Sequence, residues 1–221
     1  TRSYQENDRF AKEALLNNFN FEESGSQYKG SNIYKSKTNN IDAKLYTIDS
    51  GLIHKENING EIDADLFLFI SKHRAKEERK TLTVHPIGNF GKAEFGGAER
   101  KLCICPASFF KSLFNGLVKN SQNSEYEVTV EATHHGPFLE KPALFIEIGS
   151  TEKEWADKSA AAIVAKAIIG SINEIKNKNG DVKSFFIIGG GHYNHAANKL
   201  MLKEGFLVGH ICGKHSLDIL D

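Results

Sequence analysis

The feature that most constrains the fold is a nearly continuous apolar run over residues 64–70, Ala-Asp-Leu-Phe-Leu-Phe-Ile. Such a run is typical of a strand that is buried on both faces, and strands of this kind belong to sheets with helices on each side. Strands and helices are expected to alternate along the rest of the chain. The expected strands cover residues 81–84, 101–105, 127–132, 143–148, 183–188 and 206–211, and the expected helices cover residues 106–117, 152–178 and 196–203.

This alternation predicts a three-layer α/β/α fold with a mixed, largely parallel sheet. Ahead of it we expect a helix that ends near residue 19, a loop or ragged hairpin over residues 20–40, and a strand over residues 44–48. No repeat, low-complexity tract or linker divides the sequence, so we expect one α/β hydrolytic domain over residues 1–221. The chain starts without a methionine and stops just after a helix or strand fragment, so we expect trimmed ends.

Composition excludes several classes of protein. Lys+Arg and Asp+Glu number 28 each, so no bulk field draws the chain onto nucleic acid, and any such contact needs a local basic patch. Three cysteines without a repeated spacing do not form a disulfide framework and indicate a reducing compartment. The sequence shows neither a signal-peptide pattern nor an apolar run that could span a bilayer. We therefore expect a cytoplasmic protein that does not bind a membrane.

Polar or glycine-rich residues follow four of the expected strands. His85, the pair His134 and His135, Ser150, and a run that ends at His192 stand at these positions. Ligands of open α/β sheets bind beyond the carboxyl ends of the strands, so these four strand ends meet in one crevice if the strands are parallel. A histidine there can act as a general base near neutral pH or bind a metal. The alternative for each histidine is a structural role, with the ring in a turn or in the core.

Glu147 lies inside an apolar strand, where an unpaired carboxylate is costly. It therefore needs a metal, a histidine, a substrate amine or a structural Lys or Arg as its partner. Ser150 and Thr151 lead into a helix N-terminus, whose amides can hold an oxyanion, although simple capping explains them as well.

Glycines and a basic segment complete the candidates. Gly189, Gly190 and Gly191 allow a ligand to approach the backbone closely, or they form only a tight turn. Asn89 follows His85 in a segment that a turn also explains. The densest basic segment contains Lys72, His73 and Arg74, and it is read as a solvated loop or as a phosphate contact.

Several catalytic motifs are absent from the sequence. It contains no H-E-x-x-H, no paired Cys-x-x-Cys and no G-x-S-x-G. What remains is a histidine and glutamate site, with or without a metal, that suits the activation of water against a carbonyl group.

The motifs together resemble the archaeal-type D-aminoacyl-tRNA deacylases, a family that also occurs in plants. The resemblance covers at least residues 64–211, and its ordered set of motifs is specific although each motif alone is weak. The motifs are His85-Pro86-Ile87-Gly88-Asn89, Gly96-Gly97, Thr133-His134-His135-Gly136-Pro137, Glu147-Ile148-Gly149-Ser150-Thr151 with Trp155, Gly189-Gly190-Gly191-His192-Tyr193 and Gly209-His210-Ile211.

The resemblance implies hydrolysis of the ester that joins a D-amino acid to tRNA, which is chiral proofreading in translation. It also implies zinc as the cofactor and a fold similar to phosphorylases and peptidyl-tRNA hydrolases. The partner is then the acceptor end of D-aminoacyl-tRNA, with no DNA and no membrane, and we expect a monomer. The expected catalytic residues are His134, His135, Glu147 and His192; the expected zinc ligands are His85, His134 and His192; the expected substrate contacts are His85, Asn89, Gly189, Gly190, Gly191, Ser150, Thr151, Lys72, His73 and Arg74.

Two departures from the family pattern limit this transfer. The family has Ser-Arg-His and small polar residues after the buried strand, whereas this chain has Lys72 and a charged tail. This chain also has Asn194-His195 where Ala-Pro is common in the family, so His195 is not carried over as a site residue. Two other functions stay open: a zinc peptidase or amidohydrolase on the same kind of sheet, and a tRNA-binding module without catalysis.

Overall fold

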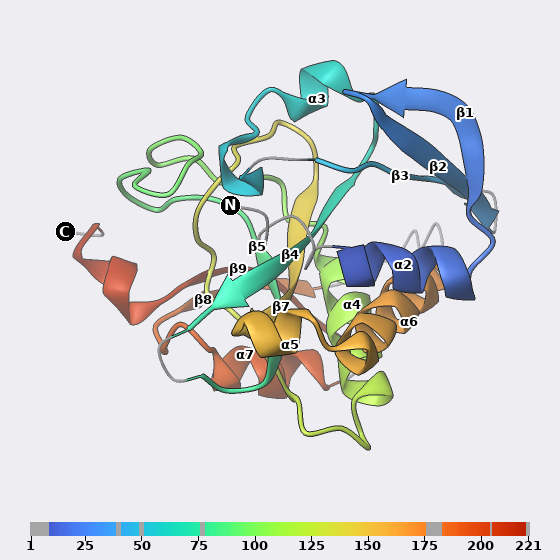
Figure 1. Ribbon diagram of the computed structural model, residues 1–221. Coiled ribbons are helices and arrows are strands. Elements are labelled where there is room, and N and C mark those ends of the chain that lie inside the picture. The colour runs from blue at the N-terminus through green and yellow to red at the C-terminus, as the bar shows by residue number, and fades with distance from the viewer. Residues whose placement is uncertain are drawn as a thin grey trace.

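The computed structural model describes residues 9–38, 41–48, 51–75, 78–175, 183–203 and 205–219. Within these ranges, no helix combines the length and the apolar character that a membrane span needs. The helices are α2 (Arg9–Asn18), α3 (Ile58–Glu61), α4 (Ala107–Asn120), α5 (Glu152–Trp155), α6 (Lys158–Glu174) and α7 (His195–Met201), with 3-10 helices η1 (Leu52–His54) and η2 (Lys214–Ile219) (Figure 1). The strands are β1 (Glu22–Tyr28), β2 (Ser31–Thr38), β3 (Ile41–Leu45), β4 (Phe67–Arg74), β5 (Thr81–Pro86), β6 (Glu127–Val130), β7 (Ala143–Ser150), β8 (Lys183–Ile188) and β9 (Phe206–Cys212).

The central sheet has four strands in the order β4-β7-β5-β6. Strand β4 is parallel to β7 and β5 is parallel to β6, whereas β7 and β5 are antiparallel. Strands β8 and β9 form a separate parallel pair, and β1, β2 and β3 form an antiparallel sheet. The predicted α/β class, with a mixed and largely parallel sheet flanked by helices, is therefore confirmed.

One face of the central sheet is apolar. Leu82 and Val84 of β5 and Ile146 of β7 are fully buried there, in one core cluster with residues of α4 and α6. Figure 1 shows α2, α4 and α6 side by side next to the sheet. Helices α4 and α6 approach closely because α4 has a glycine at the crossing: a Cβ added at Gly116 would lie 3.1 Å from the Cα of Ala167.

The opposite face is polar at its centre, because side chains alternate along a strand. Thr81, Thr83 and His85 of β5 are completely buried there, and Glu147 of the neighbouring β7 is 4% exposed. Apolar residues continue this face at one end, where Phe69 and Phe145 stack with ring centroids 4.8 Å apart and join a second core cluster. The fold thus places a buried polar patch between two apolar cores.

Several expected boundaries need correction. Residues 71–74 belong to β4, so the first half of the basic segment is a strand and not a loop. Residues 101–105 form no strand, and only Leu102 makes an isolated bridge with Gly88. The expected long helix is split into α5 and α6, because Asp157 accepts a hydrogen bond from the N–H of Ser159 and starts a new helix.

Other expectations fall outside the described residues. The last residues of the helix expected over residues 152–178 lie there, as do the first eight residues of the chain. The expectation of one domain stays a prediction. The capping box at Thr151, in contrast, is present and begins α5.

Candidate active site

Glu147 stands at the centre of the polar face because of the strand register. It pairs with Ser71 of β4 on one side and with Thr83 of β5 on the other. Its Oε2 lies 3.7 Å from Nδ1 of His73 and 3.8 Å from Nε2 of His85. The partner that a buried carboxylate requires is therefore a pair of histidines and not a lysine or an arginine.

A second buried glutamate, Glu131, lies just beyond the end of β6 and is completely buried. Its Oε2 lies 3.3 Å from Nε2 of His192 and 3.6 Å from Nε2 of His134, and its Oε1 lies 3.6 Å from Nδ1 of His73. Glu131 was not among the residues that the sequence indicated as candidates. Its only signal was an acidic side chain among apolar neighbours, directly before the Thr133-His134-His135 run.

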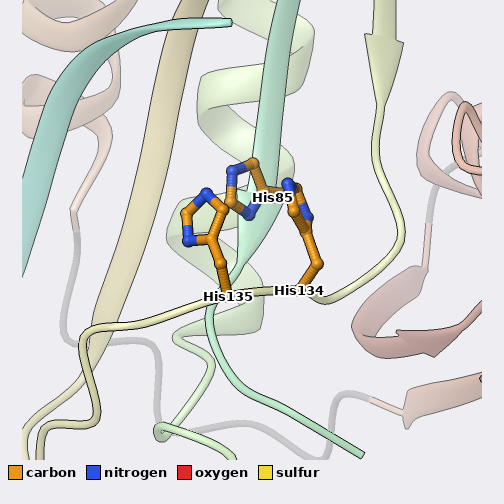
Figure 2. A group of neighbouring side chains, drawn as sticks. All are labelled: His85, His134 and His135. Carbon is orange, nitrogen blue, oxygen red and sulfur yellow. The ribbon is translucent and has the colours of Figure 1, made fainter. Parts of the chain in front are cut away.

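Three imidazole rings gather beside the glutamates. His85 comes from β5, and His134 and His135 come from the segment after β6, so that the three rings face one another in Figure 2. The centroid of the His85 ring lies 4.1 Å from that of His134 and 4.9 Å from that of His135, and the last two are 4.3 Å apart.

Backbone carbonyls fix the tautomer of these three histidines. Nδ1 of His134 lies 2.8 Å from the O of Ala132, Nδ1 of His135 lies 2.7 Å from the O of Gly136, and Nδ1 of His85 lies 3.0 Å from the O of Pro86. A carbonyl oxygen can only accept, so each Nδ1 donates a proton and each neutral ring keeps its lone pair on Nε2. Such a lone pair can bind a metal or accept a proton.

Burial and mutual repulsion keep the histidine pair neutral. Burial and the nearby His85 lower the pKa of His135 to about 4, and burial with the same neighbour lowers the pKa of His134 well below its usual value. Burial alone would lower the pKa of His85 too, but the nearby Glu147 outweighs it and raises that pKa. Burial opposes ionisation of Glu131, yet the surrounding histidines lower its pKa to about 2.

Several buried polar atoms at this site have no hydrogen-bond partner among the described residues. They are Thr81 Oγ1, Thr83 Oγ1, His85 Nε2, and both carboxylate oxygens of Glu131. An orphaned buried polar atom costs about 1–3 kcal/mol, so five of them on the polar face of the sheet and at its edge indicate room for a polar guest. We call the set His73, His85, Glu131, His134, His135, Glu147 and His192 the histidine–glutamate cluster.

Neighbouring backbone segments hold the turn that carries the histidine pair. His135 has a φ of 44°, a left-handed conformation that is uncommon without glycine. The N–H of Gly88 donates to the O of His135 at 3.0 Å. Gly136 packs so closely on Gly97 and Ile53 that a Cβ added to it would overlap backbone atoms of both. The glycine-rich segment after His85 thus supports the turn.

Thr133 anchors the start of the same turn. Its Oγ1 accepts the N–H of Ile211 at 3.0 Å and lies 3.2 Å from Nδ1 of His210, whose Nε2 lies 2.9 Å from the O of Cys103. His210 therefore donates from Nε2 to this carbonyl and accepts the hydroxyl proton of Thr133. His210, which belongs to the Gly209-His210-Ile211 motif, thus holds the turn in place.

Two expected site residues lie elsewhere, because β7 runs antiparallel to β5. The carboxyl end of β7 pairs with Thr81 at the start of β5, so Ser150 and Thr151 do not meet His85. The Oγ of Ser150 donates to the O of Arg79, and Thr151 caps α5. The expectation that all four strand ends converge in one crevice is wrong for the carboxyl end of β7.

Lys72 and Arg74 also lie apart from the cluster. They alternate with His73 along β4 and lie over the ring of Trp155, with 5.3 Å from Nζ of Lys72 and 5.0 Å from Cζ of Arg74 to its centroid. Arg74 also pairs with Glu152. Their contact with a phosphate stays a prediction.

The remaining candidates lie at the edge of the cluster and have structural partners. Nδ2 of Asn89 donates to the O of Gly96 at 2.9 Å, which closes the turn after His85. The N–H of Gly189 donates to the O of Cys212 at 2.8 Å, and the O of Gly190 accepts from Lys214 at 2.9 Å. The 189–191 run therefore orients His192, which does enter the cluster.

A buried set of imidazoles and carboxylates on the polar face of an α/β sheet is the type of site at which hydrolases activate water. The family model described as D-aminoacyl-tRNA deacylase matches residues 60–221. The chain belongs to the D-aminoacyl-tRNA deacylase family, as its motifs indicated.

Similar proteins of known sequence carry the family name. The D-aminoacyl-tRNA deacylase of Cenarchaeum symbiosum is 36% identical over 181 residues, which cover 80% of this chain and 68% of that protein. The D-aminoacyl-tRNA deacylase of Methanosarcina mazei is 35% identical over 200 residues, which cover 85% of this chain and 65% of that protein. The chain thus spans about two thirds of the length of both relatives.

A solved structure shares the fold. The crystal structure of AF0625, a conserved protein of unknown function, superimposes with a TM-score of 0.81 at 33% sequence identity. The match covers 95% of this chain and 73% of the other.

Proposed function

We propose that the histidine–glutamate cluster hydrolyses the ester bond of D-aminoacyl-tRNA, so that the products are a free D-amino acid and tRNA. The reaction follows from family membership, and it removes D-amino acids before they enter translation. The observation that supports this cluster as its site is that Nε2 of His85 and both carboxylate oxygens of Glu131 are buried without hydrogen-bond partners among the described residues. A water molecule and an ester carbonyl would meet those atoms.

Zinc is the cofactor that we propose, because its usual protein ligands are imidazole nitrogens and carboxylate oxygens. Three described sets of side chains have ligand atoms within 4.8 Å of one another. The expected ligands His85 and His134 fall into one set, whereas His192 falls into another. The sets are His85 with His134 and His135; His73 with Glu131 and His192; and His85 with Glu131 and Glu147.

A bound zinc ion would polarise the ester carbonyl and make a water molecule more acidic. The chain supplies the proton acceptor. His134 is neutral at pH 7 and its Nδ1–H donates to the O of Ala132, so its Nε2 can take a proton from the attacking water when zinc occupies one of the two sets that do not contain His134. The water oxygen then bonds to the carbonyl carbon, the bond to the ribose oxygen breaks, and that oxygen receives the proton from Nε2.

The two glutamates have separate tasks in this proposal. Glu147 orients His85 and His73, as its distances to both rings support. Glu131 stays ionised and offers a negative charge to a cation or to the substrate's ammonium group. The Gly189 amide is occupied by Cys212, so we leave it out of the stabilisation of the oxyanion.

Lys72 and Arg74 remain proposed contacts for tRNA phosphates at the rim of the protein. A monomer remains our expectation for the active form. We place the reaction in the cytoplasm because aminoacyl-tRNA is the substrate, and we propose neither DNA nor a membrane as a partner.

The test is the deacylation of D-tyrosyl-tRNA by His134→Ala and His135→Ala variants. We expect kcat to fall at least about 100-fold in His134→Ala, the size of a lost general base. His195→Ala is the matched control, because His195 is exposed at the start of α7 and should leave kcat unchanged. Full activity in both cluster variants would contradict the assignment, and cleavage of peptides without cleavage of aminoacyl-tRNA would favour a peptidase.

A further inference from the structure

Tyr193 is placed against the histidine–glutamate cluster by a short antiparallel pairing with Glu131. The N–H of Ala132 donates to the O of His192 at 2.8 Å, and the N–H of Asn194 donates to the O of Val130 at 3.0 Å. Residues that face each other in such a pairing project to the same side of it. The side chains of Tyr193 and Glu131 therefore extend in one direction, and both reach His73.

The two side chains contact opposite edges of the His73 ring. The hydroxyl oxygen of Tyr193 lies 3.1 Å from Nε2 of His73, whereas Oε1 of Glu131 lies 3.6 Å from Nδ1. The ring also stacks on that of His192, with centroids 5.9 Å apart and planes inclined by 19°. The imidazole is thus held between a hydroxyl on its outer edge and the carboxylates on its inner edge.

Backbone contacts fix the position of His73 in β4 but do not fix the orientation of its ring. Nε1 of Trp155 donates to the O of His73 at 3.0 Å, which ties β4 to α5. Gly149 leaves space beside the ring, because a Cβ added there would lie 3.2 Å from Cδ2 of His73. The orientation of the two ring nitrogens is left to Tyr193 and to the glutamates.

The hydroxyl partner distinguishes His73 from the three histidines of Figure 2. Their Nδ1 atoms face carbonyls, which only accept, so their tautomer cannot change. A tyrosine hydroxyl can donate to Nε2 or accept from it. It therefore tolerates a neutral His73 with its proton on Nδ1, facing the carboxylates, and equally one with its proton on Nε2, which frees the Nδ1 lone pair.

We propose that Tyr193 is a positioning residue that accepts the Nε2 proton of His73 and thereby directs the Nδ1 lone pair to a divalent cation shared with Glu131 and His192. The inference rests on the proposed function, in which this set is one of three candidate zinc sites. A ligating histidine usually donates its second ring N–H to an outer partner, and loss of that partner lowers the affinity for the metal about 10- to 100-fold.

The test compares Tyr193→Phe with Tyr126→Phe, each of which removes one hydroxyl. Tyr126 donates to Oδ2 of Asp157 at 2.9 Å, so its loss reports the cost of a tyrosine hydrogen bond outside the cluster. Zinc ion is titrated into the chelated protein, and kcat and KM for D-tyrosyl-tRNA are measured after loading. We expect Tyr193→Phe to weaken zinc binding about 10- to 100-fold and to lower kcat while KM changes little, and Tyr126→Phe to match the wild type. Wild-type zinc affinity in Tyr193→Phe would overturn the proposal.

A double-mutant cycle with His73→Ala separates this inference from the proposed function. If Tyr193 acts through His73, its replacement adds no further loss of kcat or zinc affinity in the His73→Ala background. Additive losses would overturn the role. A wild type that binds no zinc would contradict the cofactor proposal. The double-mutant cycle measured with kcat would then test only whether Tyr193 acts through His73. Nitrogen chemical shifts of His73 should show a protonated Nε2 in the zinc-loaded wild type.

Discussion

The Oε2 atom of Glu131 lies 3.3 Å from Nε2 of His192, inside a site that leaves both carboxylate oxygens of Glu131 without a hydrogen bond among the described residues. A completely buried carboxylate with a pKa of about 2 keeps its charge only because histidines surround it. The arrangement is costly in isolation, and it becomes favourable when a cation or an ammonium group enters. We therefore regard Glu131 as the centre of the site.

Replacement of Glu131 by glutamine tests this view, because it removes the charge and keeps the size. We expect kcat for D-tyrosyl-tRNA to fall at least about 100-fold, the scale of one lost electrostatic contact in a dry site. Glu127→Gln at the start of β6 is the matched control, because the carboxylate of Glu127 pairs with Arg79 near the surface. A Glu131→Gln enzyme with a kcat within threefold of the wild type would remove Glu131 from the mechanism; that threshold is on the order of 0.6 kcal/mol.

The stability of the metal-free protein should fall with acid in two windows. His135 titrates at about 4 in the fold against 6.5 unfolded, so the unfolded chain binds more protons between these values and stability falls as the pH drops from 6.5 to 4. Glu131, at about 2 against 4.5, adds stability that is lost as the pH falls from 4.5 to 2. His85 acts oppositely: with its raised pKa it contributes at low pH, and this contribution is lost as the pH rises through that value.

Denaturant melts of chelated protein at stepped pH measure this dependence. His135→Gln should flatten the slope in the upper window and remove on the order of 2 kcal/mol of its pH dependence. An unchanged slope in that variant would show that His135 is not buried as a neutral ring.

Gly136 should not accept a methyl group. A Cβ at this position would overlap backbone atoms of Gly97 and Ile53, which cannot move aside as a flexible side chain would. We expect Gly136→Ala to cost about 2–4 kcal/mol of unfolding free energy, within the upper range for overpacking. Gly170→Ala in α6 is the control, because nothing lies within 4 Å of its added Cβ, and it should stabilise by about 0.5–1 kcal/mol. Equal melting midpoints for the two variants would refute the close packing behind the histidine pair.

Lys72→Ala and Arg74→Ala test the proposed phosphate contacts. Both side chains lie over Trp155, on the other side of β4 from His73, so we expect KM to rise while kcat is retained. Each lost contact should also reduce the salt slope of tRNA binding by about 1. Unchanged KM and salt slope in both variants would restrict their role to packing on Trp155.

Much of the site could be predicted because its residues stand at the ends of strands. His85, His134, His135 and His192 were marked by position alone, and the structure brings their rings together, with Glu147 beside His85. What could not be predicted was the direction of β7. A strand buried on both faces has the same apolar pattern in parallel and antiparallel sheets, so the pattern left Ser150 on the wrong side.

Two residues were missed or found only by resemblance. Glu131 was part of an alternating run that already predicted a strand, and alternation does not show which face of a sheet carries chemistry. His73 was grouped with Lys72 and Arg74 in a basic segment, and the resemblance carried all three over as substrate contacts without separating His73. Local patterns thus identify strand ends, whereas the register between distant strands decides which side chains meet.

The central claim is that a cation-binding histidine–glutamate cluster hydrolyses D-aminoacyl-tRNA. The most direct measurement is the rate of D-tyrosine release from D-tyrosyl-tRNA by the wild type, before chelation, after chelation, and after addition of zinc ion alone, with the metal content determined at each stage. We expect release to be lost with the metal and restored with zinc, and L-tyrosyl-tRNA to remain intact throughout. Full release by protein shown to contain no metal, or no release at any stage, would contradict the account.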